Sequence, residues 1–149
     1  MTIKTTIGAL SSPTLSMALQ KLNGAQVNTR TAYRFKKLHD AFNASMKQCQ
    51  EKYKKDVVEV YAEKDEKNEI IPEQSPWGFK LKEGTDQVKF DEANKTFHDQ
   101  EVVIPRPPLA LSELTDVKIS AAELTALNHF LADPEDTEIV SDNVAQMRR

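Results

Sequence analysis

A single helical pattern without glycine or proline extends over about residues 31–66 and constrains this chain most strongly. A helix of that length would measure about 50 Å at roughly 1.5 Å per residue, which is more than a compact domain of this size needs. Its apolar residues recur every three or four positions and so lie on one face. They are Phe35, Leu38, Phe42, Met46, Cys49, Tyr53, Val57 and Val60. The pattern predicts an amphipathic rod whose apolar face meets another helix or another chain.

Shorter helices are indicated on both sides of this rod. Ser12 followed by Pro13 is typical of a helix start, and Asn23-Gly24 of its end, so residues 13–23 are expected to form about three turns. The Ser120-x-x-Glu123 pattern is a capping box and predicts a last helix that carries Leu124, Leu127, Phe130 and Leu131.

The extended segments are predicted from turn residues and alternation. Residues 2–10 indicate an edge strand with a bend at Gly8, and residues 101–104 a strand that ends at the prolines from Pro105 onward. Residues 77–82 and 87–90 alternate around a turn at residues 83–86, which predicts a small hairpin. Asp91 is then expected to cap a third helix that runs to about Gln100 and returns along the rod.

Together these segments predict an α+β fold, mostly α, with a long helical hairpin, a small β-hairpin or sheet and a capped C-terminal helix. The chain has 149 residues, of which 39% are hydrophobic and 29% charged, and these values fit one domain at residues 1–132 with an acidic, loosely held tail at 133–149. Residues 1–22 lack the apolar core of a secretory signal, and no apolar run is long enough for a membrane span, so we expect an intracellular protein without a membrane partner.

The residues that usually perform catalysis are scattered. His39, His98 and His129 lie on three different predicted helices without metal-ligand spacing, and Cys49 lies on the apolar face without a base beside it. The four glycines form no phosphate-binding loop, and no serine has a nucleophile-elbow context. We therefore expect no catalytic residue, no cofactor, no metal site and no enzymatic activity.

Two surfaces are candidates for partner binding. Residues 30–55 contain eight lysines and arginines against two carboxylates, a net charge of +6, which leaves −9 for the rest of a chain whose total is −3. A row around Arg34, Lys37 and Lys54 suits nucleic-acid phosphates or a host protein. It also describes the solvated face of an ordinary amphipathic helix, or an electrostatic partner for the acidic remainder of the same chain. Trp77 and Phe79, in a proline-containing loop, and Tyr61 at the end of the rod suit a protein partner or a cover for the helical core.

The order of segments resembles a family of small tailed-bacteriophage proteins of uncharacterised function. The similar segments are LSMALQKL at 15–22, TAYRFKKL at 31–38, YAEKDEKNE at 61–69, FDEANKTF at 90–97, EVVIP at 101–105, LSEL at 111–114 and ISAAELTAL at 119–127. They cover roughly residues 15–131. This chain departs from the family at residues 75–86, an insertion that contains Trp77.

The resemblance implies a phage origin, a location in the host cytoplasm or the virion, and no catalytic residues. Two functions follow as hypotheses. The first is a non-enzymatic structural or assembly protein that contacts itself or other virion proteins through the long helix and the aromatic loop. The alternative is a small phage regulator or inhibitor that binds a host protein or nucleic acid through the basic face of the long helix.

Overall fold

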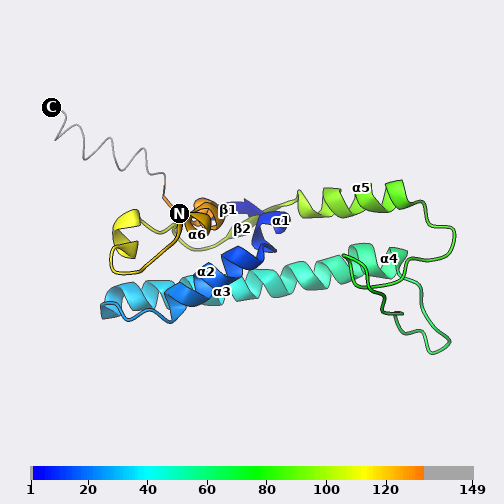
Figure 1. The fold of residues 1–149 in the computed structure, drawn as a ribbon, viewed down its shortest axis with the longest axis horizontal. Helices are drawn as coiled ribbons and strands as arrows, with labels where there is room; N and C mark the ends of the chain where they lie inside the picture. The colour runs from blue at the N-terminus through cyan, green and yellow to red at the C-terminus, as the bar shows by residue number, and fades with distance from the viewer. Residues whose placement is uncertain (1, 133–149) are drawn as a thin grey trace.

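The computed structural model describes residues 2–132 as an elongated, mostly helical α+β fold (Figure 1). Two parts follow one another along its length, and we refer to them as the body and the arm. The body contains the N-terminal half of the long helix and the segments packed on it. The arm contains the C-terminal half of that helix, residues 62–86 and the helix that follows them. The predicted tail at residues 133–149 lies outside the described residues.

The first two predicted helices are confirmed. Helix α2 (Pro13–Asn23) is capped by Ser12, and α3 (Thr29–Tyr53) by Asn28, whose Oδ1 accepts from the amide of Thr31 at 3.0 Å. Leu15, Ala18, Leu19 and Leu22 of α2 are buried against the same core as Phe35, Leu38 and Phe42 of α3. The regular spacing of these apolar residues thus packs α2 against the N-terminal half of the long helix.

The long helix ends differently from the prediction. After α3 it continues through a π-helical turn, η1 (Lys54–Val58), and a last short piece, α4 (Glu59–Tyr61), and it stops at Tyr61, not near residue 66. A π turn contains an extra residue, so the positions after it rotate relative to an α-helical register. Val57 is buried, as its place on the predicted apolar face requires. After the turn Tyr61 packs against the core, whereas Val60 is 52% exposed and leaves the predicted apolar face.

The predicted hairpin of residues 77–82 with 87–90 is wrong. Residues 87–90 are instead the first turn of α5 (Gln87–His98), which is capped by Asp86 through a 3.0 Å bond from the amide of Val88. The helix therefore begins four residues before Asp91, the expected cap. The alternation of Val88 and Phe90 was too short to indicate a strand, and the spacing of seven between Phe90 and Phe97 puts both on one helical face.

Residues 62–86 form an irregular loop in which three extended runs bond to one another. The isolated antiparallel bridges are Ala62 with Leu81, Lys64 with Ile70, and Pro72 with Phe79. The backbone amide of Glu63 donates to the carbonyl of Lys80, the amide of Lys80 to the carbonyl of Ile71, and the amide of Ile71 to the carbonyl of Glu63. Each of the three runs is therefore bonded to the other two. This loop folds back on the end of the long helix and α5 (Figure 1).

The sheet joins the N-terminal segment to the segment that follows α5. Strand β1 (Ile3–Thr6) pairs antiparallel with β2 (Glu101–Ile104), with Ile3 opposite Ile104. The predicted strand at 101–104 is confirmed, whereas the predicted strand at 2–10 is shorter because α1 (Ile7–Leu10) starts after Thr6. At Gly8 in this turn, an added Cβ would lie 3.2 Å from the carbonyl oxygen of His98, so a side chain there would push α1 away from α5.

The C-terminal part covers the body. A 3₁₀ turn, η2 (Leu111–Leu114), is followed by α6 (Ala121–Ala126) and a second 3₁₀ turn, η3 (Asn128–Phe130). The predicted capping box is confirmed, since Ser120 Oγ accepts from the amide of Glu123 at 3.1 Å and Glu123 accepts from the amide of Ser120 at 2.9 Å. Leu127 and Phe130 are fully buried, and the buried residues form one continuous cluster through body and arm.

Candidate functional site

The aromatic residues of the loop and of the helix end gather around Phe90, which is 0% exposed. The ring centroids of Trp77, Tyr61 and Phe79 lie 4.8, 5.4 and 6.1 Å from that of Phe90, all in edge-to-face arrangements. We call these four residues the aromatic cluster. Phe79 is only 4% exposed, and Trp77 and Tyr61 are half-buried. The Trp77 loop thus covers the core at the end of the long helix. Phe79 is buried there and is not an exposed anchor for a partner.

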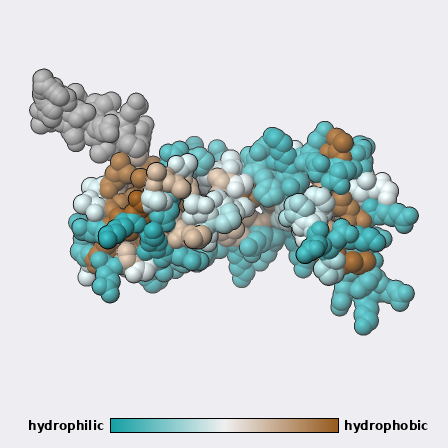
Figure 2. Space-filling view, viewed as in Figure 1, coloured by the Kyte–Doolittle hydropathy of each residue, from teal (hydrophilic) through white to brown (hydrophobic). Residues whose placement is uncertain are grey.

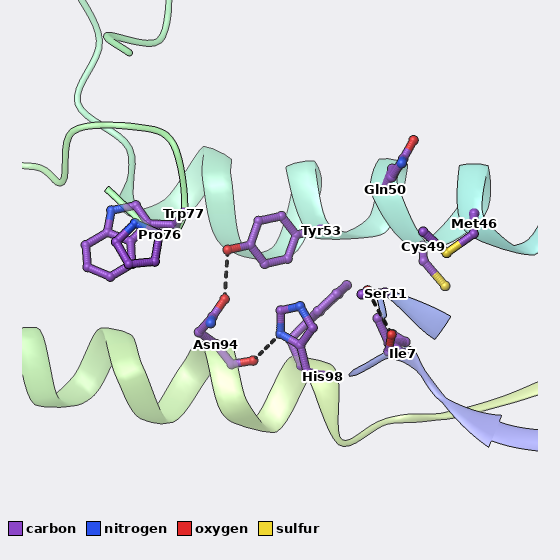
Figure 3. Close-up of a pocket in the computed structure, with 11 residues that line it drawn as sticks. Ile7, Ser11, Met46, Cys49, Gln50, Tyr53, Pro76, Trp77, Asn94 and His98 are labelled. Carbon is purple, nitrogen blue, oxygen red and sulfur yellow. Dashed lines mark hydrogen bonds between the residues drawn. The ribbon is translucent and has the colours of Figure 1, made fainter. Parts of the chain in front are cut away.

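A cavity of about 490 Å³ lies between α3 and α5, and we call it the interhelical cavity (Figure 3). Four segments line it: α1, α3, the loop and α5. Most of its walls are apolar or aromatic. The lining residues are Ile7, Ser11, Met46, Cys49, Gln50, Tyr53, Pro76, Trp77, Asn94, Phe97 and His98.

Two of the polar groups at this cavity, from Tyr53 and His98, bond to Asn94. The Tyr53 hydroxyl donates to Asn94 Oδ1 at 2.7 Å, and His98 Nδ1 lies 2.8 Å from the carbonyl oxygen of Asn94 (Figure 3). Because a carbonyl oxygen only accepts, Nδ1 must carry the hydrogen in this bond. A neutral His98 therefore has its lone pair on Nε2, which is available as an acceptor.

Neither Cys49 nor Tyr53 is activated as a nucleophile at this site. Burial raises the pKa of the Cys49 thiol, and the positive charge of Lys52 opposes that rise only in part. Burial also raises the pKa of Tyr53. Both groups are therefore neutral at pH 7, and the cavity is suited to hold a molecule more than to attack one.

A second, more open hollow of about 510 Å³ runs between the end of the long helix and α5, and we call it the distal groove. Its floor is apolar, with Val57, Tyr61, Ala93 and Phe97, and Val60 stands exposed on one wall. Polar and charged residues surround this floor: Asp56, Lys89, Glu92, Thr96 and Gln100. Figure 2 shows separate hydrophobic patches at the far end of the arm, within a mainly hydrophilic surface. An apolar floor inside a polar rim is the usual composition of a protein contact.

The basic row of the long helix is partly engaged within the fold. Arg34 donates from Nε and Nη2 to the two carboxylate oxygens of Glu113, both at 2.9 Å, and to the carbonyl of Pro108 at 3.1 Å. The Lys37 ammonium lies 5.2 Å from the ring centre of Tyr33. Among residues 2–132, Lys54 has no ion pair. The three residues thus have different environments, and Arg34 serves to attach η2 to α3.

The three histidines have separate partners. His39 lies 3.4 Å from the amide of Asn43, His98 bonds to Asn94, and His129 Nδ1 lies 2.6 Å from the hydroxyl of Thr5. Within the described part of the chain, no three His, Cys, Asp or Glu side chains are grouped to hold a metal ion. Between residues 2 and 132, each helix is too short or too polar to cross a membrane.

Sequence patterns did not indicate the arrangement at the interhelical cavity. Tyr53 was recognised only as part of an apolar face, and Asn94 and His98 only as residues of a third helix. The one available signal was the i, i+4 spacing of Asn94 and His98, which puts both on one side of α5. Their meeting with Tyr53 depends on how α5 packs against α3.

Comparison with models of known protein families, with curated proteins and with solved structures finds no match to this chain.

Proposed function

We propose that this chain is a non-enzymatic phage structural or assembly protein that acts through protein–protein contacts made by its arm. The phage origin is supported by the resemblance of its segment order to small tailed-phage proteins. The single structural observation that supports the mode of action is the distal groove, in which Val60 is half exposed beside an apolar floor. The partner is a second copy of the chain or another virion protein.

The groove suits a protein partner because it combines an exposed apolar group with rigid walls. Val60 lies at the end of a helix of 33 residues, counted from Thr29 to Tyr61, which positions it far from the body. Complete burial of a fully exposed valine is worth roughly 1.5–3 kcal/mol, and because Val60 is 52% exposed a contact that covers it gains about half of that. Asp56, Lys89 and Glu92 at the rim supply both signs of charge for orientation.

The test uses two variants that differ in position only. Val60→Asp puts a carboxylate into the distal groove, whereas Val88→Asp puts one on α5 outside the groove, at a residue that is 63% exposed. Since both side chains are exposed, both variants are expected to fold. We expect Val60→Asp alone to lose self-association in light scattering or incorporation into purified particles.

The oligomeric state and the particle content of the wild type can overturn this proposal. A wild-type protein that is a single monomeric species, and is absent from particles and from assembly intermediates, has no such role. Equal behaviour of the two variants would place the contact elsewhere than the distal groove. The neighbouring genes are a further check, since a place among capsid and tail genes is expected.

We also propose an alternative, a regulator or inhibitor that binds a host protein or nucleic acid through the basic face. What favours it is that Arg30, Lys47, Lys54 and Lys55 have no ion pair among residues 2–132, although Arg34 is occupied by Glu113. Binding to DNA or RNA should then weaken steeply with salt, and Lys54→Glu with Lys55→Glu should reduce it. Absence of salt-dependent binding, together with no host protein retained, would exclude this function.

A further inference from the structure

We propose that the interhelical cavity binds a small neutral aromatic molecule with a hydroxyl group, whose hydroxyl donates a hydrogen bond to Nε2 of His98. This inference does not depend on the proposed function, because the interhelical cavity and the distal groove share only Phe97 among their lining residues. It rests on the size of the cavity, the chemistry of its walls and the hydrogen bonds already made there.

The size and enclosure fit a small ligand. A volume of about 490 Å³ is within the range of roughly 300–1,000 Å³ that is usual for ligand sites. Walls from α1, α3, the loop and α5 line it and leave it partly open to solvent, and α3, the loop and α5 are joined at its edge by a hydrogen bond or aromatic contacts. Tyr53 lies 5.1 Å from Phe97 and 5.6 Å from His98 between ring centroids, and Trp77 is held by Phe90. The site is thus formed before any ligand enters.

The walls select an uncharged, aromatic molecule. None of the eleven lining residues is Lys, Arg, Asp or Glu, so nothing there compensates the desolvation of a charged ligand. Tyr53, Trp77, Phe97 and His98 contribute rings, which prefer edge-to-face or offset contact with another ring. Met46 and Cys49 contribute sulfur atoms, which also contact aromatic rings favourably.

Two ring nitrogens at the cavity have no partner among residues 2–132: Nε2 of His98, an acceptor in the neutral ring, and the buried Nε1–H of Trp77, a donor. The Tyr53 hydroxyl is used on Asn94, the Ser11 hydroxyl donates to the carbonyl of Ile7 at 2.9 Å, and His98 Nδ1–H is used on the Asn94 carbonyl. His98 Nε2 has no partner in the described part of the chain. Figure 3 shows the His98 ring between Tyr53 and the side of the cavity formed by Ile7 and Ser11. A ligand that donates one hydrogen bond therefore complements Nε2 of His98.

Phenol is the probe for this site, and anisole, which has the same ring without a donor, is its matched comparison. The chain has one tryptophan, so Trp77 gives a single indole resonance in an NMR titration. For seven heavy atoms we expect a saturable shift of that resonance with a dissociation constant on the order of 1 mM or tighter. Anisole should bind about fivefold more weakly, the factor that one net hydrogen bond supplies.

Two variants separate the cavity from the acceptor. Cys49→Phe fills the space and should abolish the binding of both probes, whereas His98→Phe should make phenol bind no better than anisole while anisole binding persists. Met17→Ala, at an exposed position of α2 that does not line the cavity, is the control and should bind as the wild type does. Circular dichroism confirms that each variant is folded.

The proposal is overturned if phenol causes no saturable shift, if the folded Cys49→Phe variant binds phenol unchanged, or if the wild type binds phenol and anisole equally. Should Cys49→Phe not fold, the wild-type phenol-to-anisole ratio and its loss in His98→Phe decide the question. Neither result bears on self-association, so failure here is distinguishable from failure of the proposed function.

Discussion

Replacing Phe90 with alanine tests whether the aromatic cluster holds the arm together. Phe90 is fully buried on α5, and rings from three other places contact it: Tyr61 from the end of the long helix, and Trp77 and Phe79 from the loop. Among residues 2–132, no other aromatic ring contacts all three of these rings. Its removal should therefore loosen the loop and the helix end together.

The expected loss is about 4 kcal/mol in the free energy of unfolding. A buried Phe→Ala change usually costs about 3–5 kcal/mol, and the three edge-to-face contacts, at roughly 0.5–1.5 kcal/mol each, favour the upper half of that range over the lower. For a chain of this length each kcal/mol lowers the melting temperature by about 3 °C, so a decrease of about 12 °C is expected. Val88→Ala, at an exposed position of the same helix, should change stability by no more than about 0.5 kcal/mol.

Urea unfolding followed by circular dichroism measures the loss, and tryptophan fluorescence reports the loop directly, because Trp77 is the only tryptophan. In Phe90→Ala the Trp77 emission should shift to longer wavelength as water reaches the indole. Limited proteolysis should cut first within residues 62–86. A loss below about 1 kcal/mol, or an unchanged Trp77 emission, would refute the view that Phe90 organises the arm.

Three further predictions concern local interactions. The Arg34 guanidinium, with the amide of Ala110, holds the pKa of Glu113 below its ordinary value of 4.5, so the pair stabilises the fold above that pH, and its contribution is lost as the pH falls through the lowered pKa. Glu113→Gln should cost about 1–2 kcal/mol at pH 7 and progressively less as the pH falls below 4.5, and a loss that does not decline with falling pH would contradict this ionic origin. Ser120→Ala should cost about 1 kcal/mol in thermal unfolding and Ser120→Asp much less, whereas equal losses would exclude a role in capping. Gly84→Ala should cost about 1 kcal/mol because φ is +81° there with no atom within 4 Å of the added Cβ; no loss would show that the turn adapts.

The sequence alone determined the features that depend on neighbouring residues. Caps at Ser12 and Ser120 were readable because a side-chain oxygen satisfies an amide two or three positions along the same chain. The apolar face of α3 was readable because helical periodicity requires no knowledge of the partner. The strand at Glu101–Ile104 was readable from its composition and the prolines that follow. The mostly helical α+β class followed from these elements.

Tertiary structure decided the features that depend on distant residues. The partner of β2 is β1, almost 100 residues away, and no local signal specifies that pairing. After the π turn, Tyr61 and not Val60 lies on the inner face of the long helix, and Tyr61 packs against Phe90 of α5. The cavity beside Tyr53 and His98 likewise exists only because α3 and α5 pack side by side and leave a space between them. Packing between distant segments selects among local conformations of similar free energy, and a sequence pattern does not contain that selection.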